Sequence, residues 1–389
     1  MAEIKELKNV RRNKKRKKFI KKLLTFFAMC VGIVLVFYIS VLANKIDIKA
    51  WVLSEMSAIT TKSTGFPIDL ETDNSKGFVK AGSDMLVLTE SNARLVTKSG
   101  KNVVNLQHGF QNPQVKAISG KFLIYDRGTN HISMQSKTGT VYEVATENPI
   151  ISAAISQKGR AAIITEAQMY ASQMIVVDKK GNELFKWNSD GKAAVSASFS
   201  YDENMIATAT IGAENGDMST TVYLISFDKN TGEANEDKAI DFKSTMPLSV
   251  AYKKDGRLSV IGDNMAVNID EQGNATDAYR FGDQNLQFID ETADNATVLC
   301  FGDYDHFQNT VIMVVFDSYN NAVKISLDVK IKSAKVYGDK IYVLTDDAIK
   351  VYNKSGTLIE SNAIGDEIKD ILPFGGEIFM LTPSQLRKF

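Results

Sequence analysis

The stretch ISAAISQKGRAAIITEAQMYASQMIVVDKKG, residues 151–181, contains the pattern from which the fold can be predicted. It holds three apolar runs, 151–155, 161–165 and 174–177, which are rich in Ile, Val and Ala. Short runs of this kind, bounded by Gly, Asp, Asn and Ser, are typical of β-strands. The polar groups SQKGR and DKKG predict tight turns, because Asp and Ser cap turns and Gly accepts a positive φ. The stretch therefore predicts three consecutive strands.

The turn signal DKKG recurs along the chain in related forms that combine Asp, Lys, Ser or Asn with a following Gly. From the first to the last copy is 256 residues over six intervals, or about 43 residues per repeat. That period is the length of a four-stranded propeller blade. The copies end at Gly100, Gly139, Gly181, Gly232, Gly273 and Gly356, with a degenerate copy, DSYNN, near Asn321.

A second marker, a short alternating strand followed by a tight turn, opens each repeat and occurs eight times. We therefore predict an all-β fold, an eight-bladed β-propeller over residues 65–389, with seven blades as the alternative if one weak repeat is miscounted. The eighth repeat ends before its outermost strand. We expect FPIDL, residues 66–70, to supply that strand and close the ring, since an open ring would leave unpaired edges. The eight copies are 78–84, 115–121, 151–159, 195–204, 248–256, 286–295, 331–339 and 368–376.

The balanced charge of the chain, 46 basic and 46 acidic residues, conceals two opposed regions. Residues 1–22 hold eleven Lys or Arg and two Glu, a net charge of +9, so the rest of the chain carries −9. The 21 residues from Leu23 to Ala43 are uncharged. As a helix they would span about 30 Å, the thickness of the hydrocarbon core of a bilayer. Residues 1–22 and 23–43 therefore predict a basic arm and a transmembrane helix.

A basic cluster before a span marks the cytoplasmic side. We thus expect a single-pass protein of the cell membrane, with its N-terminus cytoplasmic and the propeller extracytoplasmic, joined by a linker, 44–64, that is helical or irregular. Membrane lipid is the partner of residues 23–43. A cleaved signal peptide ending at Ala43 is the alternative. A basic cluster so close to a span favours a topology signal over a nucleic-acid site, so no nucleic-acid partner is expected.

The predicted blades also separate two faces of the ring. If the strands of a blade are lettered A to D from the inside outward, the A–B and C–D turns share one face. The B–C loops and the D–A connections share the other, which we call the B–C rim. Three B–C loops are long, 166–173, 211–220 and 301–310. Because loops carry function more often than the scaffold does, we expect the B–C rim to be the interaction face.

Most candidate residues of this rim are carboxylates and His, and carboxylates recur from blade to blade. Their convergence would attract a cation or a basic partner. The alternative is that Asp and Asn occur there as turn formers. A mixed His and carboxylate metal site is not indicated, because no pair has the spacing of a known metal motif. The candidates are Glu166, Tyr170, Glu214, Asn215, Asp217, Asp303, Asp305, His306, His108, Asp126 and Arg127.

Four motifs carry a resemblance to a known group of proteins: QHGFQNP (107–113), LIYDRGTN (123–130), YASQMIVVDKKG (170–181) and IGAENGD (211–217). With them the chain resembles an uncharacterised family of membrane-anchored β-propellers in Gram-positive bacteria, within the quinoprotein-like and WD40-like superfamily. The resemblance implies an anchor and a propeller, and no activity. The WD dipeptides and the Trp motifs of quinone-dependent dehydrogenases are missing from the sequence.

No motif of a hydrolase, a nucleotide-binding enzyme or a metalloenzyme occurs in the sequence. We therefore expect no catalytic residues, no metal and no cofactor, and interpret the chain as a non-catalytic binding or scaffolding module for protein or cell-envelope partners at the B–C rim. Two alternatives remain. One is a hydrolase of glycan or peptide that uses rim carboxylates, and the other is a sensor for a small ligand in the central channel.

Overall fold

A computed structural model describes residues 65–70, 74–118, 120–214, 216–228, 230–291, 296–302 and 310–389. The chain divides into two units, Met1–Thr60 and Thr61–Phe389, and every described residue belongs to the second. The predicted basic arm, span and linker (1–64) lie outside the described residues, as do Asn215, Asp303, Asp305 and His306. Within the ranges that the structure describes, no helix is long and apolar enough to cross a membrane.

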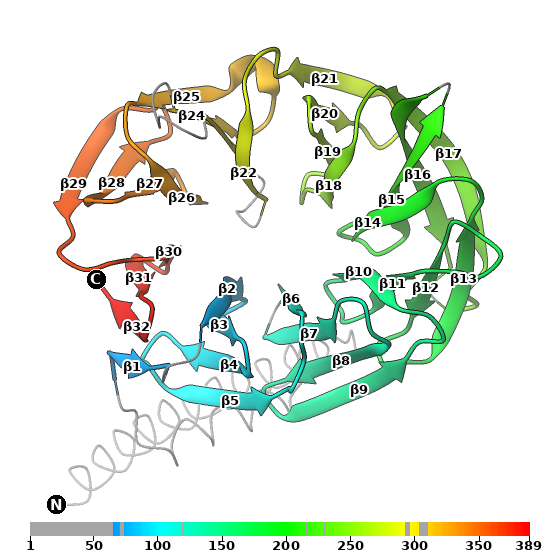
Figure 1. Ribbon diagram of the computed structural model, residues 1–389, viewed down its shortest axis with the longest axis horizontal. Coiled ribbons are helices and arrows are strands. Elements are labelled where there is room, and N and C mark those ends of the chain that lie inside the picture. The colour runs from blue at the N-terminus through cyan, green and yellow to red at the C-terminus, as the bar shows by residue number, and fades with distance from the viewer. Residues whose placement is uncertain are drawn as a thin grey trace, which may run out of the picture. The chain divides into compact units, whose positions relative to one another are not determined.

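Eight four-stranded antiparallel sheets stand around a central axis, as the propeller prediction requires, and the seven-bladed alternative is excluded (Figure 1). The strand nearest the axis is the A strand of each blade. The A strands are β2 (Ser75–Ala81), β6 (Pro113–Ile118), β10 (Ile150–Ile155), β14 (Ala193–Phe199), β18 (Pro247–Tyr252), β22 (Leu286–Asp290), β26 (Ile331–Tyr337) and β30 (Asp370–Phe374).

The next two positions outward are the B and C strands, joined by the B–C loops. The B strands are β3 (Asp84–Thr89), β7 (Lys121–Asp126), β11 (Ala161–Thr165), β15 (Met205–Glu214), β19 (Leu258–Gly262), β23 (Thr297–Phe301), β27 (Lys340–Thr345) and β31 (Glu377–Leu381). The C strands are β4 (Asn92–Thr97), β8 (His131–Ser136), β12 (Ser172–Val177), β16 (Asp217–Phe227), β20 (Met265–Ile269), β24 (Thr310–Val315), β28 (Ala348–Asn353) and β32 (Gln385–Lys388).

The D strands form the outer wall of the ring, and a short 3-10 helix, η1 (Tyr319–Asn321), precedes one of them. The D strands are β5 (Asn102–Gln107), β9 (Gly139–Ala145), β13 (Glu183–Ser189), β17 (Ala234–Lys243), β21 (Ala275–Arg280), β25 (Val323–Leu327), β29 (Leu358–Ala363) and β1 (Ile68–Asp69).

The ring closes by pairing the two ends of the propeller. Strand β1 lies beside β32, with Ile68 opposite Leu386, and so becomes the outer strand of the eighth blade. The amide of Leu70 donates to the carbonyl of Ser384 at 2.8 Å, and the Leu70 side chain is fully buried. The short segment assigned to this role from the sequence, 66–70, thus contains the paired residues.

The core lies between neighbouring blades. The B strands are buried along their whole length in several blades, for example β3 and β11. They are covered on both faces, and so they consist of continuous apolar residues such as AAIIT (161–165) instead of alternating ones. The outer strand β29, in contrast, is exposed at nearly every position. This layering explains why the apolar run 161–165, which forms β11, is unbroken.

The recurring turns owe their sequence to hydrogen bonding. In the DKKG turn the carboxylate of Asp178 accepts the amides of Lys180 at 2.8 Å and Asn182 at 2.9 Å, and Gly181 has a φ of 87°. The first residue therefore caps the turn and the glycine supplies a conformation that other residues rarely adopt. The degenerate copy without Gly forms η1 instead, where the Ser318 hydroxyl accepts the amide of Asn320.

Candidate functional site

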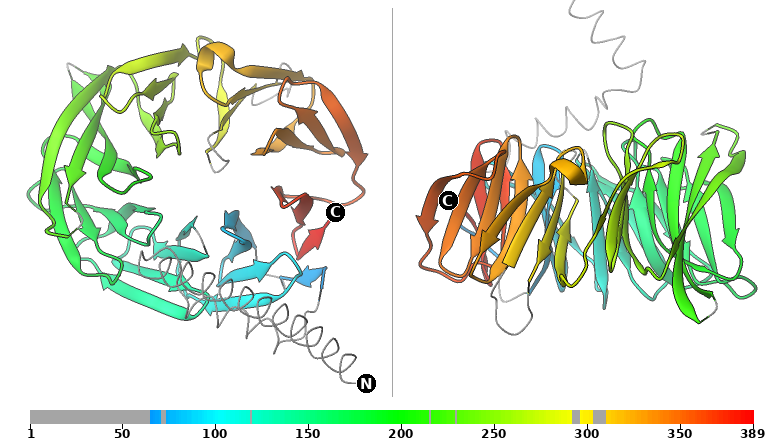
Figure 2. Two further views of the ribbon diagram at one scale, coloured as in Figure 1. Left: turned by 180° about the vertical axis from the view of Figure 1, so that it is seen from behind. Right: turned by 90° about the horizontal axis from the view of Figure 1, so that it is seen from above.

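The edge-on view in Figure 2 shows the two faces of the ring, between which the strands run. At the B–C rim, Glu166 and Tyr170 lie in the loop between β11 and β12. Glu214 and Asp217 face each other at the tip of the hairpin of β15 and β16. Both pairs are exposed, and they belong to neighbouring blades.

The segment 211–220 was expected to be a loop and is instead mostly strand. The pairing of β15 with β16 continues through Ile211 and Thr220 to the last pair, Glu214 and Asp217. At the base of this extension, the pairs Thr210–Thr221 and Ile211–Thr220 are strand-forming residues that favour continued pairing. The two carboxylates are therefore carried on a projecting hairpin.

Two predicted rim residues, Asp126 and His108, accept hydrogen bonds from backbone amides. The carboxylate of Asp126, nearly buried, accepts the amides of Asn112 at 2.7 Å and Gln111 at 3.3 Å. The Nδ1 atom of His108 accepts the amide of Phe110 at 3.0 Å, so its proton lies on Nε2, which contacts the carbonyl of Thr89 at 3.3 Å. These contacts fix the connection between the first two blades and explain both residues structurally.

Further rim carboxylates have similar structural roles. Asp263 accepts the amide of Met246 at 2.9 Å, and Asp346 pairs with Lys332 at 3.0 Å. A hydrogen bond from the Thr345 hydroxyl, 2.7 Å long, lowers the pKa of Asp347. In these blades the turn-forming interpretation of the acidic residues is therefore the better one.

Blades 3 and 4 differ from this pattern. The side-chain carboxylates of Glu166, Glu214 and Asp217 have no hydrogen-bond or ion-pair partner within the described part of the chain. Arg127, in the second blade, has an exposed side chain. The structure thus divides the predicted set into residues that hold turns and residues that are available at the surface.

Exposed apolar side chains accompany the free carboxylates on the same rim. Met169 is 89% exposed, Tyr170 42%, Met218 47% and Met246 38%. We call these four residues the rim patch, and they belong to three consecutive blades. Exposed Met and aromatic residues are enriched in protein interfaces. Tyr170 was among the residues predicted from the sequence, whereas the three Met were not, because the exposure of a loop Met cannot be judged from its residue type.

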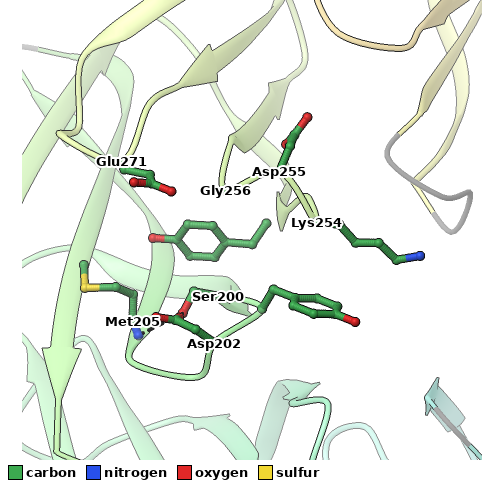
Figure 3. Close-up of a pocket in the computed structure, with 9 residues that line it drawn as sticks. Ser200, Asp202, Met205, Lys254, Asp255, Gly256 and Glu271 are labelled. Carbon is green, nitrogen blue, oxygen red and sulfur yellow. Dashed lines mark hydrogen bonds between the residues drawn. The ribbon is translucent and has the colours of Figure 1, made fainter.

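The opposite face of the ring, which carries the A–B and C–D turns, holds a cavity of about 450 Å³ between blades 4 and 5 (Figure 3). Two A–B turns and one C–D turn form its walls. Its lining residues are Ser200, Tyr201, Asp202, Met205, Tyr252, Lys254, Asp255, Gly256 and Glu271.

The cavity exists because one turn departs from the pattern of its neighbours. The turns of blades 3 and 5 end in Arg160 and Arg257, whose carbonyls accept the amide that starts each turn. Both arginines reach the following blade: Arg160 pairs with Glu203, and Arg257 donates to the carbonyls of Phe316 and Asp317. In blade 4, Met205 makes the equivalent backbone bond and lines the cavity. Without an arginine there, the space toward blade 5 is left open.

The carboxylates of the cavity are not equivalent. Asp202 accepts from the Ser200 hydroxyl at 2.6 Å and from Asn204, and these bonds lower its pKa. Asp255 is paired with its neighbour Arg257 at 2.8 Å. Glu271 has no partner among the described residues and lies against Gly256.

The remaining polar groups of the cavity are phenols. Burial, together with the nearby carboxylates of Asp202 and Asp237, raises the pKa of Tyr252 to about 12, so its hydroxyl stays protonated at neutral pH. Tyr201 is 54% exposed. The described residues contain no group of three or more His, Cys, Asp or Glu arranged to hold a metal ion.

The fold is shared with solved β-propellers. BamB from Moraxella catarrhalis matches 84% of this chain and 99% of its own with a TM-score of 0.52 and 11% identity. The C-terminal WD40 domain of Sif2 matches 83% of this chain and 98% of its own with a TM-score of 0.59 and 15% identity. At such identities the likeness shows the fold alone, because one fold hosts many functions.

No curated protein is significantly similar to the chain in sequence. One family model, described as a family of unknown function, DUF5711, matches residues 56–388 and so covers the whole propeller. The chain belongs to that family, and its fold is that of the solved β-propellers that it matches.

Proposed function

We propose that the chain is a single-pass membrane protein that presents a non-catalytic binding propeller outside the cytoplasmic membrane, with a protein or envelope partner at the B–C rim. The observation that carries this proposal is the rim patch. Exposed Met and Tyr side chains, and carboxylates without a partner among the described residues, lie on the same rim in neighbouring blades. Such a surface suits a partner that combines apolar and basic groups.

The membrane part of the proposal rests on the sequence. Residues 23–43 are uncharged and follow the basic arm, which would remain in the cytoplasm beside anionic lipid headgroups. A reporter enzyme that is active only outside the cytoplasm, fused after Phe389, should be active in intact cells. A fusion that is active only with a cytoplasmic reporter would overturn this orientation.

The binding part is tested by reversing the charge of Glu166, Glu214 and Asp217 to Lys in the full-length chain. Proteins that copurify with the unaltered chain should be lost, because like charges would then face a basic partner. The control reverses three exposed glutamates away from the rim, Glu143, Glu183 and Glu233, and should retain the partners. Equal retention by both variants would contradict the assignment of the rim.

A further inference from the structure

We infer that the cavity between blades 4 and 5 binds a cationic group on an aliphatic stem, such as the side chain of a lysine in a peptide or a free diamine. This site lies on the face opposite the rim patch, and it does not depend on the proposed function of that rim. The inference rests on the shape of the cavity, on the types of side chain that form its walls and on the one carboxylate that lacks a partner.

The volume of the cavity is that of a small-molecule site. A volume of about 450 Å³ falls within the range of ligand cavities in proteins, which is roughly 300–1,000 Å³. The space is also a consequence of the blade sequence, since Met205 stands where the turns of blades 3 and 5 place a bridging arginine. A bound cation would therefore lie where Arg160 and Arg257 place their guanidinium groups in the turns of blades 3 and 5.

The walls combine two features that suit a cation with an apolar stem. Tyr201 and Tyr252 offer aromatic rings, which attract ammonium and guanidinium groups, and Met205 offers an apolar contact for methylene groups. Figure 3 shows Glu271 and Asp202 on opposite sides of the cavity, with the side chain of Lys254 extending away from Glu271. The positive end of a ligand can thus approach Glu271 without meeting the Lys254 amine.

The charges decide the sign of the ligand. Three carboxylates and one ammonium group line the cavity, and two of the carboxylates, Asp202 and Asp255, are already held by hydrogen bonds within their own turns. Glu271 is the carboxylate without such a partner among the described residues. A ligand ammonium group would give Glu271 the charge-assisted hydrogen bond that it lacks.

The test titrates the full-length chain with three probes: a lysine blocked at both ends by acetyl and N-methylamide groups, the same compound with norleucine, and cadaverine. Heat of binding or ligand-detected NMR reports the affinity. Blocked lysine should bind, and norleucine should bind at least about tenfold more weakly, since it has the stem without the charge. Binding of cadaverine alone would identify a free diamine as the ligand and would support the cationic site. Equal binding of lysine and norleucine, or no binding of either amine, would overturn the proposal.

Three variants locate the site. Glu271→Gln should weaken lysine binding about tenfold, because it removes the charge of the carboxylate without removing an internal hydrogen bond. Met205→Arg should abolish binding, because it introduces the arginine that the turns of blades 3 and 5 carry at this place. Glu183→Gln makes the same charge change on the same face outside the cavity and should bind as the unaltered chain does. Unchanged affinity in both Glu271→Gln and Met205→Arg would place the binding elsewhere and contradict the proposal.

Discussion

A lysine near the axis of the ring shows how single side chains join the blades. Lys335 on β26 pairs with Asp290 of the preceding blade, and its ammonium group also interacts with Asp370 of the following blade. Burial raises the pKa of Asp370, although Lys335 and the Ser333 hydroxyl, 2.6 Å away, act in the opposite direction. Although burial alone would lower it, the two carboxylates raise the pKa of Lys335. Three blades are thus linked by one buried cation.

Replacement of Lys335 by Met should therefore destabilise the propeller by about 3 kcal/mol at neutral pH, since it leaves two carboxylates without their cation. Because the pKa of Asp370 is raised in the folded state, protonation at lower pH favours folding. The loss of unfolding free energy in the variant, relative to the unaltered chain, should therefore become smaller as the pH falls from 7 to about 5. Urea denaturation at both pH values measures it.

The matched control is Lys186→Met, which removes an exposed ion pair with Glu183. Its effect should stay below about 1 kcal/mol at both pH values. A Lys335→Met deficit that is equally large at both pH values would show that lost packing, and not the carboxylates, causes the destabilisation.

A second prediction at this scale concerns Gly256, whose φ is +88°. A Cβ atom there would lie 2.4 Å from the Oε1 atom of Glu271, so an alanine must displace that carboxylate. Gly256→Ala should cost about 1 kcal/mol of stability and should weaken binding of blocked lysine. Calorimetric titration and thermal unfolding measure the two effects.

Gly159 provides the control for this substitution. It occupies the same place in the turn of blade 3, with a φ of +90°, and the nearest atoms to its Cβ would be 3.5 Å away on Lys121. Gly159→Ala should share the backbone strain and leave lysine binding unchanged. Loss of binding in both variants would indicate that strain in the turns, and not the position of Glu271, controls the site.

At the scale of elements, the short closure strand β1 makes contacts with both ends of the propeller. It pairs through only two residues, yet Leu70 beside it is fully buried, and the Phe66 ring lies 5.4 Å from the ring of Phe379. The carbonyl of Asp69 also accepts from Arg94 of the first blade at 2.9 Å. This strand therefore connects both ends of the ring.

Deletion of residues 66–70 should lower the thermal unfolding midpoint strongly and promote aggregation, because it exposes the edge of β32 and the apolar side chains beneath it. Leu70→Ala is the milder form and should cost about 2–5 kcal/mol. Leu358→Ala on the exposed strand β29 is the control and should have little effect. A soluble deletion variant with an unchanged midpoint would contradict closure by this strand.

The elements also show what the sequence could predict. Turn signals such as DKKG specify local hydrogen bonds, and so the repeat and the eight sheets could be predicted from residues near one another in the chain. The closing strand could be predicted because the eighth repeat ends before its outermost strand. The cavity could not be predicted in this way, because it depends on contact between two blades: Met205 does not bridge to blade 5 as an arginine would. The sequence signal for the cavity is that SYDENM (200–205) lacks the arginine with which SQKGR and KKDGR end.

At the scale of the whole molecule, the two opposite faces of the ring carry different surface features. The rim patch and the free carboxylates of blades 3 and 4 form the B–C surface, whereas Asp126 and His108 show that other predicted rim residues hold turns. The A–B face holds the cavity. A rigid ring separates the two surfaces, which would allow a partner protein and a small cationic ligand to bind at the same time.

The most direct test of the proposed binding function is photo-crosslinking in intact cells. A photoreactive amino acid replaces Met169 in the rim patch, or Ile359, which is 54% exposed on the outer strand β29, in the full-length chain. We predict a discrete crosslinked product from position 169, none from position 359, and loss of the product when Glu166, Glu214 and Asp217 are changed to Lys. Equal products from both positions, or a product from position 169 that persists after the charge reversal, would contradict the account.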